Sequence, residues 1–564
     1  MALREYEPVP AEPVSPTTTD ESGRQRAVAI DVRRFPWIRP LAGDYAFNFQ
    51  QIAPLYAGNP LTAGAWRDAV ARAQQHPRDR RAIAAVVAAQ QDARDAPPAS
   101  RAAGARLADP ASVAVVTGQQ AGVFGGPLFT LLKAITAIQL ARRTEQKQGV
   151  PAIAIFWVDA EDHDWEEVRS CTVLDAEFQP RTVTLAALEQ AGEAPIASLL
   201  LDERVGQTLR ELEAALQRTE FTADVMRALG AAWQPGVGMA RAFARWLETL
   251  LGPLGLVVFE SADPAAKPLV ADVFSRELAS PGRTAALAAE AGAVLAARGH
   301  SPQVVPQPDS LALFSLDGGR HPIRRQGDTL LIGGRSFSSD ALSAEARTRP
   351  SAFSPNVLLR PIVQDTLFPT ICYVAGPSEL AYLGQLRGVY ERFGVPMPLM
   401  YPRASATLLD SAASRFLAKY GVALEELQPQ DESALNRLLA SQLPAGVEQS
   451  LRDATEQIQR SMQRVIEAMP AIDPTLAGAA KTTLGKIEHD LRSLHGKVIQ
   501  AAKRRDETLR RQFMRLQAQA FPLGHSQERT LAGIYFLNRY GPGVVDRLME
   551  GLPVEPGWHW IITV

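Results

Sequence analysis

Two short apolar runs, separated by a glycine-rich loop and an amphipathic segment, constrain the fold of this chain more than any other feature. The first run, Val113 to Val116, leads into the loop Thr117 to Gly126, and Pro127 then opens a segment with helical spacing of apolar residues. The second run, Ile153 to Val158, is β-branched and aromatic without alternation, which is typical of a strand buried on both faces. Together they predict a βαβ unit with two parallel strands.

Because the carboxyl ends of parallel strands share one edge of a sheet, the loops after both strands should border the same crevice. The glycine-rich loop offers a flexible backbone and free N–H groups at a helix start, which favour a phosphate or carboxylate. Its spacing is neither GxGxxG nor a P-loop pattern, and Lys133 stands too far along the helix to be a P-loop lysine. A tight turn alone would also explain the glycines. The residues predicted here to bind substrate or nucleotide are Thr117, Gly118, Gln119, Gln120 and Gly125.

A dense acidic cluster follows the second strand. Six carboxylates and one histidine stand between Asp159 and Glu167. A solvated helix start would account for part of this density, because the helix dipole favours acids there. An imidazole among carboxylates suits acid/base chemistry, so His163 is the predicted general base, while the oxygens suit Mg²⁺ better than Zn²⁺ without defining a metal site. The predicted catalytic residues are Asp159, Glu161, Asp162 and His163.

Two later apolar runs also end in polar residues. After Leu256 to Phe259, Lys267 could meet a carboxylate or phosphate, although Ser261 or Asp263 could equally serve as a simple helix cap. The run Ile371 to Ala375 leads through a Gly-Pro turn into a helix start, where capping again competes with ligand binding. Four polar strand ends favour a single crevice. The further predicted binding residues are Asn356, Arg360, Gln364, Ser378, Glu379 and Tyr382.

Six motifs, spread over nearly the whole chain after about residue 35, carry a resemblance to a known family. They read TGQQAGVFGGPLFTLLKA, FWVDAEDHDWEEV, GLVVFESADPAAK, SPNVLLRPIVQDTLFPTICYVAGPSELAYLGQL, MPLMYPR and SQERTLAGIYFLNRYG. In order and type they resemble the BshC family, the cysteine ligases of bacillithiol biosynthesis. Several long motifs in the right order are far more specific than any one of them.

The resemblance implies ligation of L-cysteine to glucosaminyl-malate, the last step toward bacillithiol, and a homodimer supported by a coiled-coil arm. Amide formation needs an activated carboxylate, so ATP is the expected cofactor and Mg²⁺ a candidate companion. Nothing in the residues tells cysteine from another amino acid, and no complete HxGH or KMSKS signature is present. Two alternatives stay open: a nucleotidyl transferase acting on a sugar or small acid, and a non-catalytic coiled-coil scaffold.

The composition narrows the classes of partner and compartment. With 59 basic and 61 acidic residues the formal net charge is -2, so no basic field points to nucleic acid. Two cysteines without a CxxC pattern argue against a disulfide scaffold or zinc ribbon and favour a reducing cytoplasm. Cys372 lies in an apolar run and is expected to be a buried structural thiol. No run reaches the roughly 18 apolar residues of a transmembrane helix, so no membrane association is expected.

The expected fold class is α/β, with a Rossmann-like parallel-sheet core that contains inserted segments. Residues 1–28, rich in proline and charge, are predicted to be a disordered tail. The core is expected over 29–410, with insertions at about 172–250 and 300–350. In the second insertion, Asp-Gly-Gly and Gln-Gly-Asp predict hairpins, and the basic residues around Arg320 favour a solvated hairpin over an anion contact.

Residues 411–520 are predicted to form a long α-helical, antiparallel coiled-coil arm. Apolar residues recur at steps of three and four from Val447 to Met469 and again from Leu484 to Ala501, with a turn expected near Pro470 to Pro474. Residues 521–564 are expected to form a C-terminal helix that returns to the core.

Overall fold

The computed structural model describes residues 17–19, 25–443, 446–473 and 475–564. The chain divides into two compact units. The core unit runs up to Leu408 and resumes at Gln527, and the arm unit is Leu409–Ser526. These limits lie close to the predicted ends of the core and the arm.

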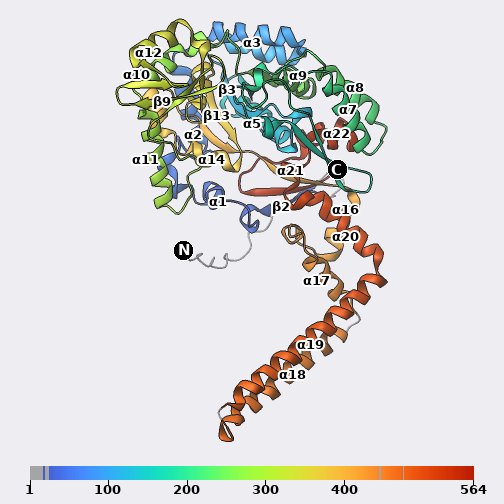
Figure 1. Cartoon of the computed structure of the whole chain (residues 1–564). Coiled ribbons are helices and arrows are strands. Elements are labelled where there is room, and N and C mark those ends of the chain that lie inside the picture. Colours follow the sequence, from blue (N-terminus) through green and yellow to red (C-terminus); the bar gives the residue numbers. More distant parts are fainter. Residues whose placement is uncertain (1–16, 20–24, 444–445, 474) are drawn as a thin grey trace. The chain divides into compact units, whose positions relative to one another are not determined.

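A five-stranded parallel sheet forms the centre of the core unit (Figure 1). Its order is β14-β13-β3-β4-β7, so β3 pairs with β4 on one side and β13 on the other. All four predicted strands are confirmed, because each apolar run is buried on both faces of this sheet. The strands are β3 (Val113–Gln120), β4 (Ala152–Asp159), β7 (Val257–Glu260), β13 (Thr370–Ala375) and β14 (Leu399–Pro402).

The order in which the chain adds strands to the sheet reverses between β3 and β13, while all strands stay parallel. The chain adds β4 and then β7 on one side of β3, and later β13 and β14 on the other side. Such a reversal opens a crevice outside the carboxyl ends of the two neighbouring strands. Helix α5 (Leu128–Gln148) links β3 to β4, and its inward face is buried over most of its length. The sheet therefore confirms the Rossmann-like prediction.

Helices cover the sheet and connect its strands. Among them are α2 (Ala63–Gln75), α3 (Arg80–Arg94) and α9 (Met239–Leu251). Both cysteines are buried and free, and burial raises the pKa of Cys171 to about 12, which confirms a structural role for Cys372 and indicates one for Cys171. The other covering helices are α1 (Pro40–Phe47), α4 (Pro98–Ala105), α10 (Ala271–Ala279), α11 (Arg283–Ala297), α13 (Arg360–Leu367), α14 (Pro377–Leu383) and α15 (Arg387–Phe393).

Two insertions interrupt the core where the sequence predicts them. The first holds α6 (Trp165–Val168), a hairpin of β5 (Ser170–Leu174) and β6 (Pro180–Thr184), and helices α7 (Arg204–Ala215) and α8 (Thr222–Ala232). The second is an antiparallel sheet of order β11-β10-β9-β8-β12. Its strands and helix are β8 (Ser310–Ser315), β9 (His321–Gln326), β10 (Thr329–Ile332), β11 (Arg335–Ser338), β12 (Phe353–Pro355) and α12 (Ser339–Thr348).

The two ends of the chain pair in a second sheet that the sequence does not predict. Strand β2 (Gln25–Asp31) lies between β1 (Thr17–Thr19) and β16 (Trp558–Thr563), with β15 (Ser405–Leu409) beside β16. The prediction of a disordered tail is therefore wrong for residues 17–19 and 25–28, and the rest of that tail lies outside the described residues. β2 has its partner more than 500 residues away, so no local pattern could reveal it.

The C-terminal segment returns to the core as predicted, but as several elements rather than one helix. It contains α21 (Gln527–Thr530), α22 (Gly533–Tyr540) and α23 (Gly543–Gly551) before β16. Gly533 donates its N–H to the carbonyl of Gly126 at 3.1 Å, so this segment touches the glycine-rich loop.

The arm unit contains the predicted antiparallel helical hairpin. Gln459 in α18 (Val447–Ala468) donates to Glu488 at 2.8 Å, and Glu448 lies 3.1 Å from His495, so contacts run in opposite directions along α18 and α19 (Leu476–Arg505). The chain turns at Met469–Ala471, and Pro474 lies outside the described residues. The remaining helices are α16 (Ser411–Tyr420), α17 (Ser433–Ser441) and α20 (Glu507–Ala520). Over the described residues, no helix is long and apolar enough to cross a membrane.

Candidate active site

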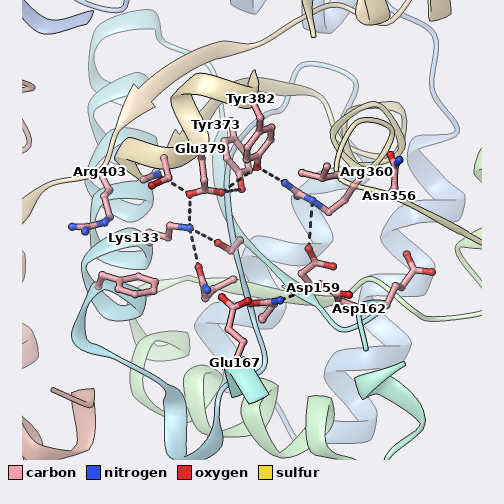
Figure 2. A pocket seen from close by; sticks show the side chains of 18 of the residues that line it. Lys133, Asp159, Asp162, Glu167, Asn356, Arg360, Tyr373, Glu379, Tyr382 and Arg403 are labelled. Atoms are coloured by element: carbon pink, nitrogen blue, oxygen red, sulfur yellow. Dashed lines mark hydrogen bonds and ion pairs between the residues drawn. The ribbon is translucent and has the colours of Figure 1, made fainter. Parts of the chain in front are cut away.

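A cavity of about 320 Å³ lies at the carboxyl ends of β3, β4 and β13, where the strand order reverses (Figure 2). This is the place that the polar strand ends predict. Gln120 at the end of β3 donates to Asp162 beyond β4 at 3.2 Å, so the two loops share one crevice. The predicted residues that line the cavity are Gly118, Gln119, Gln120, Asp159, Glu161, Asp162, Asn356, Arg360, Ser378, Glu379 and Tyr382.

Lys133 is a cavity residue that the sequence analysis passed over. Its side chain is buried, and Nζ donates to the Gly118 carbonyl at 2.8 Å and lies 2.6 Å from Oε2 of Glu379. Helical side chains lean toward the helix N-terminus, so a residue well inside α5 can reach the end of β3. The spacing of Lys133 excludes a P-loop lysine. Its single charge on an otherwise apolar helix face is the signal that could have predicted a buried polar contact.

The Lys133–Glu379 pair is electrostatically tight. Burial lowers the pKa of Lys133 despite the neighbouring carboxylate. Burial alone would raise the pKa of Glu379, but the charge and hydrogen bond of Lys133 hold it below its usual range. The carboxylate thus opposes the effect of burial on Lys133, and the lysine opposes its effect on Glu379.

A continuous series of contacts leads from Lys133 across the cavity to Asp159, and Figure 2 shows it as linked dashed lines. Tyr382 donates to Glu379 at 3.3 Å, Arg360 donates to Tyr382 at 2.8 Å, and Nε of Arg360 lies 3.4 Å from Asp159. Burial raises the pKa of Asp159, and Arg360 opposes that rise. We name these five residues the polar chain of the cavity.

The acidic side of the cavity is paired with cations. Lys267 forms a buried ion pair with Glu161 and a 3.3 Å hydrogen bond to the Phe353 carbonyl. Burial raises the pKa of Glu161 even so. Lys267 therefore meets a carboxylate, as one sequence-based alternative held, although it does not itself line the cavity.

Arg320 also pairs with this acidic side, although the sequence favoured a solvated position for it. Its side chain is only 8% exposed, and Nη1 donates to Oδ1 of Asp162 at 3.3 Å. The guanidinium lies 3.7 Å from the centre of the Phe314 ring. The correction has a topological cause, because the β8–β9 turn of the insertion folds toward the end of β4.

A third group of cations surrounds Phe129, which lines the cavity. The charged groups of Lys133, Arg403 and Arg529 lie 5.9, 5.5 and 5.8 Å from its ring centre. Arg403 is held by Glu528 through bonds of 2.9 and 2.6 Å. Arg529 is exposed and makes no hydrogen bond or ion pair with another described residue. Arg403 directly follows β14, and Arg529 lies in the segment that returns after the arm. Both were missed because nothing near them in the sequence predicts that these two segments meet at Phe129.

Four predicted residues lie outside the cavity lining. Thr117 donates to the Val374 carbonyl at 2.9 Å, and Gln364 donates to Asp365 at 2.9 Å, both inside the core. Gly125 faces the indole of Trp246, which would lie 2.6 Å from an added Cβ. His163 stands at the edge, with its side chain 44% exposed.

The glycine-rich loop is not open to a ligand at the helix start, where the sequence predicts an anion. The Leu128 N–H, the first of α5, donates to the Leu531 carbonyl at 2.8 Å. The C-terminal segment thus occupies the position predicted for a phosphate or carboxylate. Gly125 and Gly126 adopt φ values of +96° and +69°, so they serve the turn itself.

The cavity carboxylates do not converge as metal ligands. Among the described residues, no group of three or more His, Cys, Asp or Glu side chains is arranged to hold a metal ion. Asp159, Glu161 and Asp162 instead face Arg360, Lys267 and Arg320. These residues fit organic cations and anions better than Mg²⁺.

The fold and the cavity together define a Rossmann-like α/β protein with a polar small-molecule site and a coiled-coil arm. Comparison with known families agrees over almost the whole chain. Residues 28–404 match the family model described as "Bacillithiol biosynthesis BshC, N-terminal Rossmann-like domain", and residues 406–564 match its "C-terminal coiled-coil domain". The chain belongs to the BshC family.

Individual relatives cover most of the chain. A protein of Salinibacter ruber is 33% identical over 525 residues, which span 92% of this chain and 95% of the relative. A protein of Symbiobacterium thermophilum is 34% identical over 496 residues, 85% of this chain and 89% of the relative. Both carry the name "Putative cysteine ligase BshC".

Proposed function

We propose that this chain is a ligase that joins L-cysteine to the amine of glucosaminyl-malate, with ATP activating the cysteine carboxylate. The names of the relatives support the reaction class. The observation that carries the proposal is the polar chain, which holds a cation at one end of the cavity and a carboxylate of raised pKa at the other. Such a site can bind oxyanions and accept a proton within one small volume.

Asp159 is our candidate general base. In the amide-forming step the amine nitrogen attacks the activated carbonyl carbon, the new C–N bond forms, and the C–O bond to the phosphate group breaks with its electrons leaving on phosphate. The amine proton passes to a base. Burial raises the pKa of Asp159 toward that task, whereas the sequence-predicted base His163 stands outside the lining.

The cationic end of the cavity, where Lys133, Arg403 and Arg529 surround Phe129, suits the anionic parts of the substrates. Arg529 offers a guanidinium without a protein partner among the described residues, beside Phe129 and Arg403. A guanidinium fork matches a carboxylate or phosphate well. We assign this end to a carboxylate of glucosaminyl-malate or a phosphate of ATP.

The test is incubation of the purified protein with glucosaminyl-malate, L-cysteine, ATP and Mg²⁺, followed by mass spectrometry. A cysteinyl product with ADP supports an acyl-phosphate route, and one with AMP supports an adenylate. A nucleotidylated sugar or acid would instead identify a nucleotidyl transferase. Intact ATP without product, together with full stability of an Asp159→Asn variant, would favour a scaffold.

We also propose a cytoplasmic homodimer associated through the arm. The hairpin of α18 and α19 leaves Val447, Val465 and Leu494 exposed, so these side chains are available to a second copy of the arm. Light scattering of the full chain should give the mass of two copies, and substituting Val465 and Leu494 with lysine should halve it.

A further inference from the structure

Arg320 is the cavity cation that the inserted antiparallel sheet supplies. It directly follows Gly318 and Gly319, whose φ values of +72° and +133° let the β8–β9 turn bend sharply. The side chain stacks on Phe314 and reaches the loop after β4, where Asp162 and His163 stand. A segment that the core sheet does not need therefore borders the reaction site.

Arg320 and Asp162 both contact the imidazole of His163 at Nδ1. Nη1 of Arg320 lies 3.0 Å from this nitrogen, and Oδ1 of Asp162 lies 3.2 Å from it. A guanidinium can only donate, so a hydrogen bond between Arg320 and His163 needs Nδ1 as the acceptor. In that arrangement Nδ1 serves the contact with Arg320 and is not offered to a substrate.

Arg320 retains donors that the protein does not use. Nη1 is its one hydrogen-bonded nitrogen within the described part of the chain, and Nε is buried without a partner. A buried charged donor without a hydrogen-bond partner costs free energy unless a bound ligand accepts from it. Because Arg320 lines the cavity, that ligand would be a bound oxyanion.

We propose that Arg320 binds a carboxylate or phosphate of the substrates and that His163 is a positioning residue that, with Asp162, holds Arg320 over the cavity. This inference rests on the proposed ligase function. It replaces the role of His163 as general base with a structural contact between the insertion and the core. The anion comes either from L-cysteine or glucosaminyl-malate, as a carboxylate, or from ATP, as a phosphate.

Steady-state kinetics of Arg320→Ala, His163→Ala and His163→Gln test the roles. We expect Arg320→Ala to raise the KM of one substrate by about tenfold to a hundredfold, since a charge-assisted bond is lost. His163→Ala should raise the same KM, and His163→Gln should raise it less because the amide oxygen can accept from Arg320. The substrate affected separates the carboxylate from the phosphate source.

The pH profile of kcat distinguishes positioning from base catalysis. Under the proposal it keeps its shape in His163→Gln. A loss of kcat by about a hundredfold or more, with disappearance of the acidic limb, would overturn the proposal in favour of a general base. An unchanged KM for every substrate in Arg320→Ala would overturn it as well.

Hydrogen exchange of the full-length protein provides a readout that needs no ligase activity. His163→Ala and Arg320→Ala should both speed exchange over residues 316–326, whereas Arg325→Ala, which changes an exposed arginine on β9, the strand that follows Arg320, should not. Faster exchange in a protein that proves inactive would retain the contact and reject the proposed function. Unchanged exchange in both variants would reject the contact itself.

Discussion

At the scale of single residues, the cavity is built from charges that are neutralised in pairs. Lys133 faces Glu379, Asp159 faces Arg360, and Glu161 faces Lys267. A buried pair adds little to stability compared with apolar packing, but removing one partner leaves the other charge uncompensated. The pairs therefore make the cavity sensitive to single substitutions.

Glu379→Gln should show this sensitivity. The change leaves the buried Lys133 ammonium without its carboxylate, so we expect the free energy of unfolding to fall by about 3 kcal/mol. Urea denaturation measures it. The matched control is Glu391→Gln, which breaks an exposed pair with Arg387 and should cost less than about 1 kcal/mol. Equal losses in the two variants would contradict the pairing argument.

Arg529→Ala should act on binding and leave stability unchanged. The exposed guanidinium makes no hydrogen bond or ion pair with another described residue, and its contact with Phe129 is a 5.8 Å cation–π approach. We therefore expect KM for an anionic substrate to rise about tenfold while kcat and the unfolding midpoint hold. Arg210→Ala, on the exposed face of α7, is the control for loss of one surface charge. A wild-type KM for all substrates would remove Arg529 from the site.

At the scale of elements, the sequence predicts those strands and helices whose pattern of apolar residues is contained within their own segment. The four buried runs, the glycine turn and helices such as α9 follow from periodicity and composition, because each burial pattern is visible within its own segment. The polar strand ends then predict the cavity edge. Lys133 and Arg320 were misplaced because their roles depend on which distant segment folds against them.

The glycine-rich loop shows the same limit. Its glycines suggested an anion site, but Gly125 is required by its positive φ and by the nearby indole of Trp246. No sequence pattern around the loop predicts that Trp246 packs against Gly125 or that the Leu531 carbonyl accepts the first N–H of α5.

Gly125→Ala should therefore destabilise the fold while leaving substrate KM unchanged. An added Cβ would lie 2.6 Å from Nε1 of Trp246, in addition to the strain of φ +96°. Gly255→Ala, with φ +90° and open space around its Cβ, measures the backbone strain alone. We expect Gly125→Ala to cost about 1 to 3 kcal/mol more in thermal unfolding. A change in KM without a change in stability would restore the anion-site interpretation.

At the scale of the whole molecule, the arm is inserted between two segments that build the cavity wall. Arg403 precedes the arm and Arg529 follows it. Gln527 holds both the N–H and the carbonyl of Leu408 at 2.7 Å, so the chain leaves and re-enters the core at one point. At this point Glu528 pairs with Arg403, and His559 of β16 contacts the hydroxyl of Ser405. Because the whole arm separates Arg403 from Arg529 in the sequence, no local pattern predicts that both line the same cavity.

His559 makes this junction sensitive to acid. It is buried against the hydroxyls of Ser405 and Thr407 at 2.7 and 2.8 Å, and burial lowers its pKa to about 4 from 6.5. Between these values the unfolded chain binds a proton that the folded chain does not, so stability falls as pH drops from about 6.5 to 4, by roughly 3 kcal/mol.

Thermal unfolding between pH 7 and 4 measures this effect. His559→Gln should reduce the dependence, and His76, whose pKa burial also lowers to about 4, should supply part of what remains. His489→Gln, exposed on the arm, should leave the dependence as in the wild type. A parallel decline in all three proteins would assign the acid sensitivity to other groups.

The position of Arg529 near the end of the chain also bears on synthesis. A ribosome that has translated the first 408 residues has made every strand of the parallel sheet, yet the cavity still lacks one wall and α5 lacks its cap. The missing pieces emerge only after the arm has been translated. A nascent chain that stops before the returning segment would lack this wall, so binding competence would report that translation has passed Leu531.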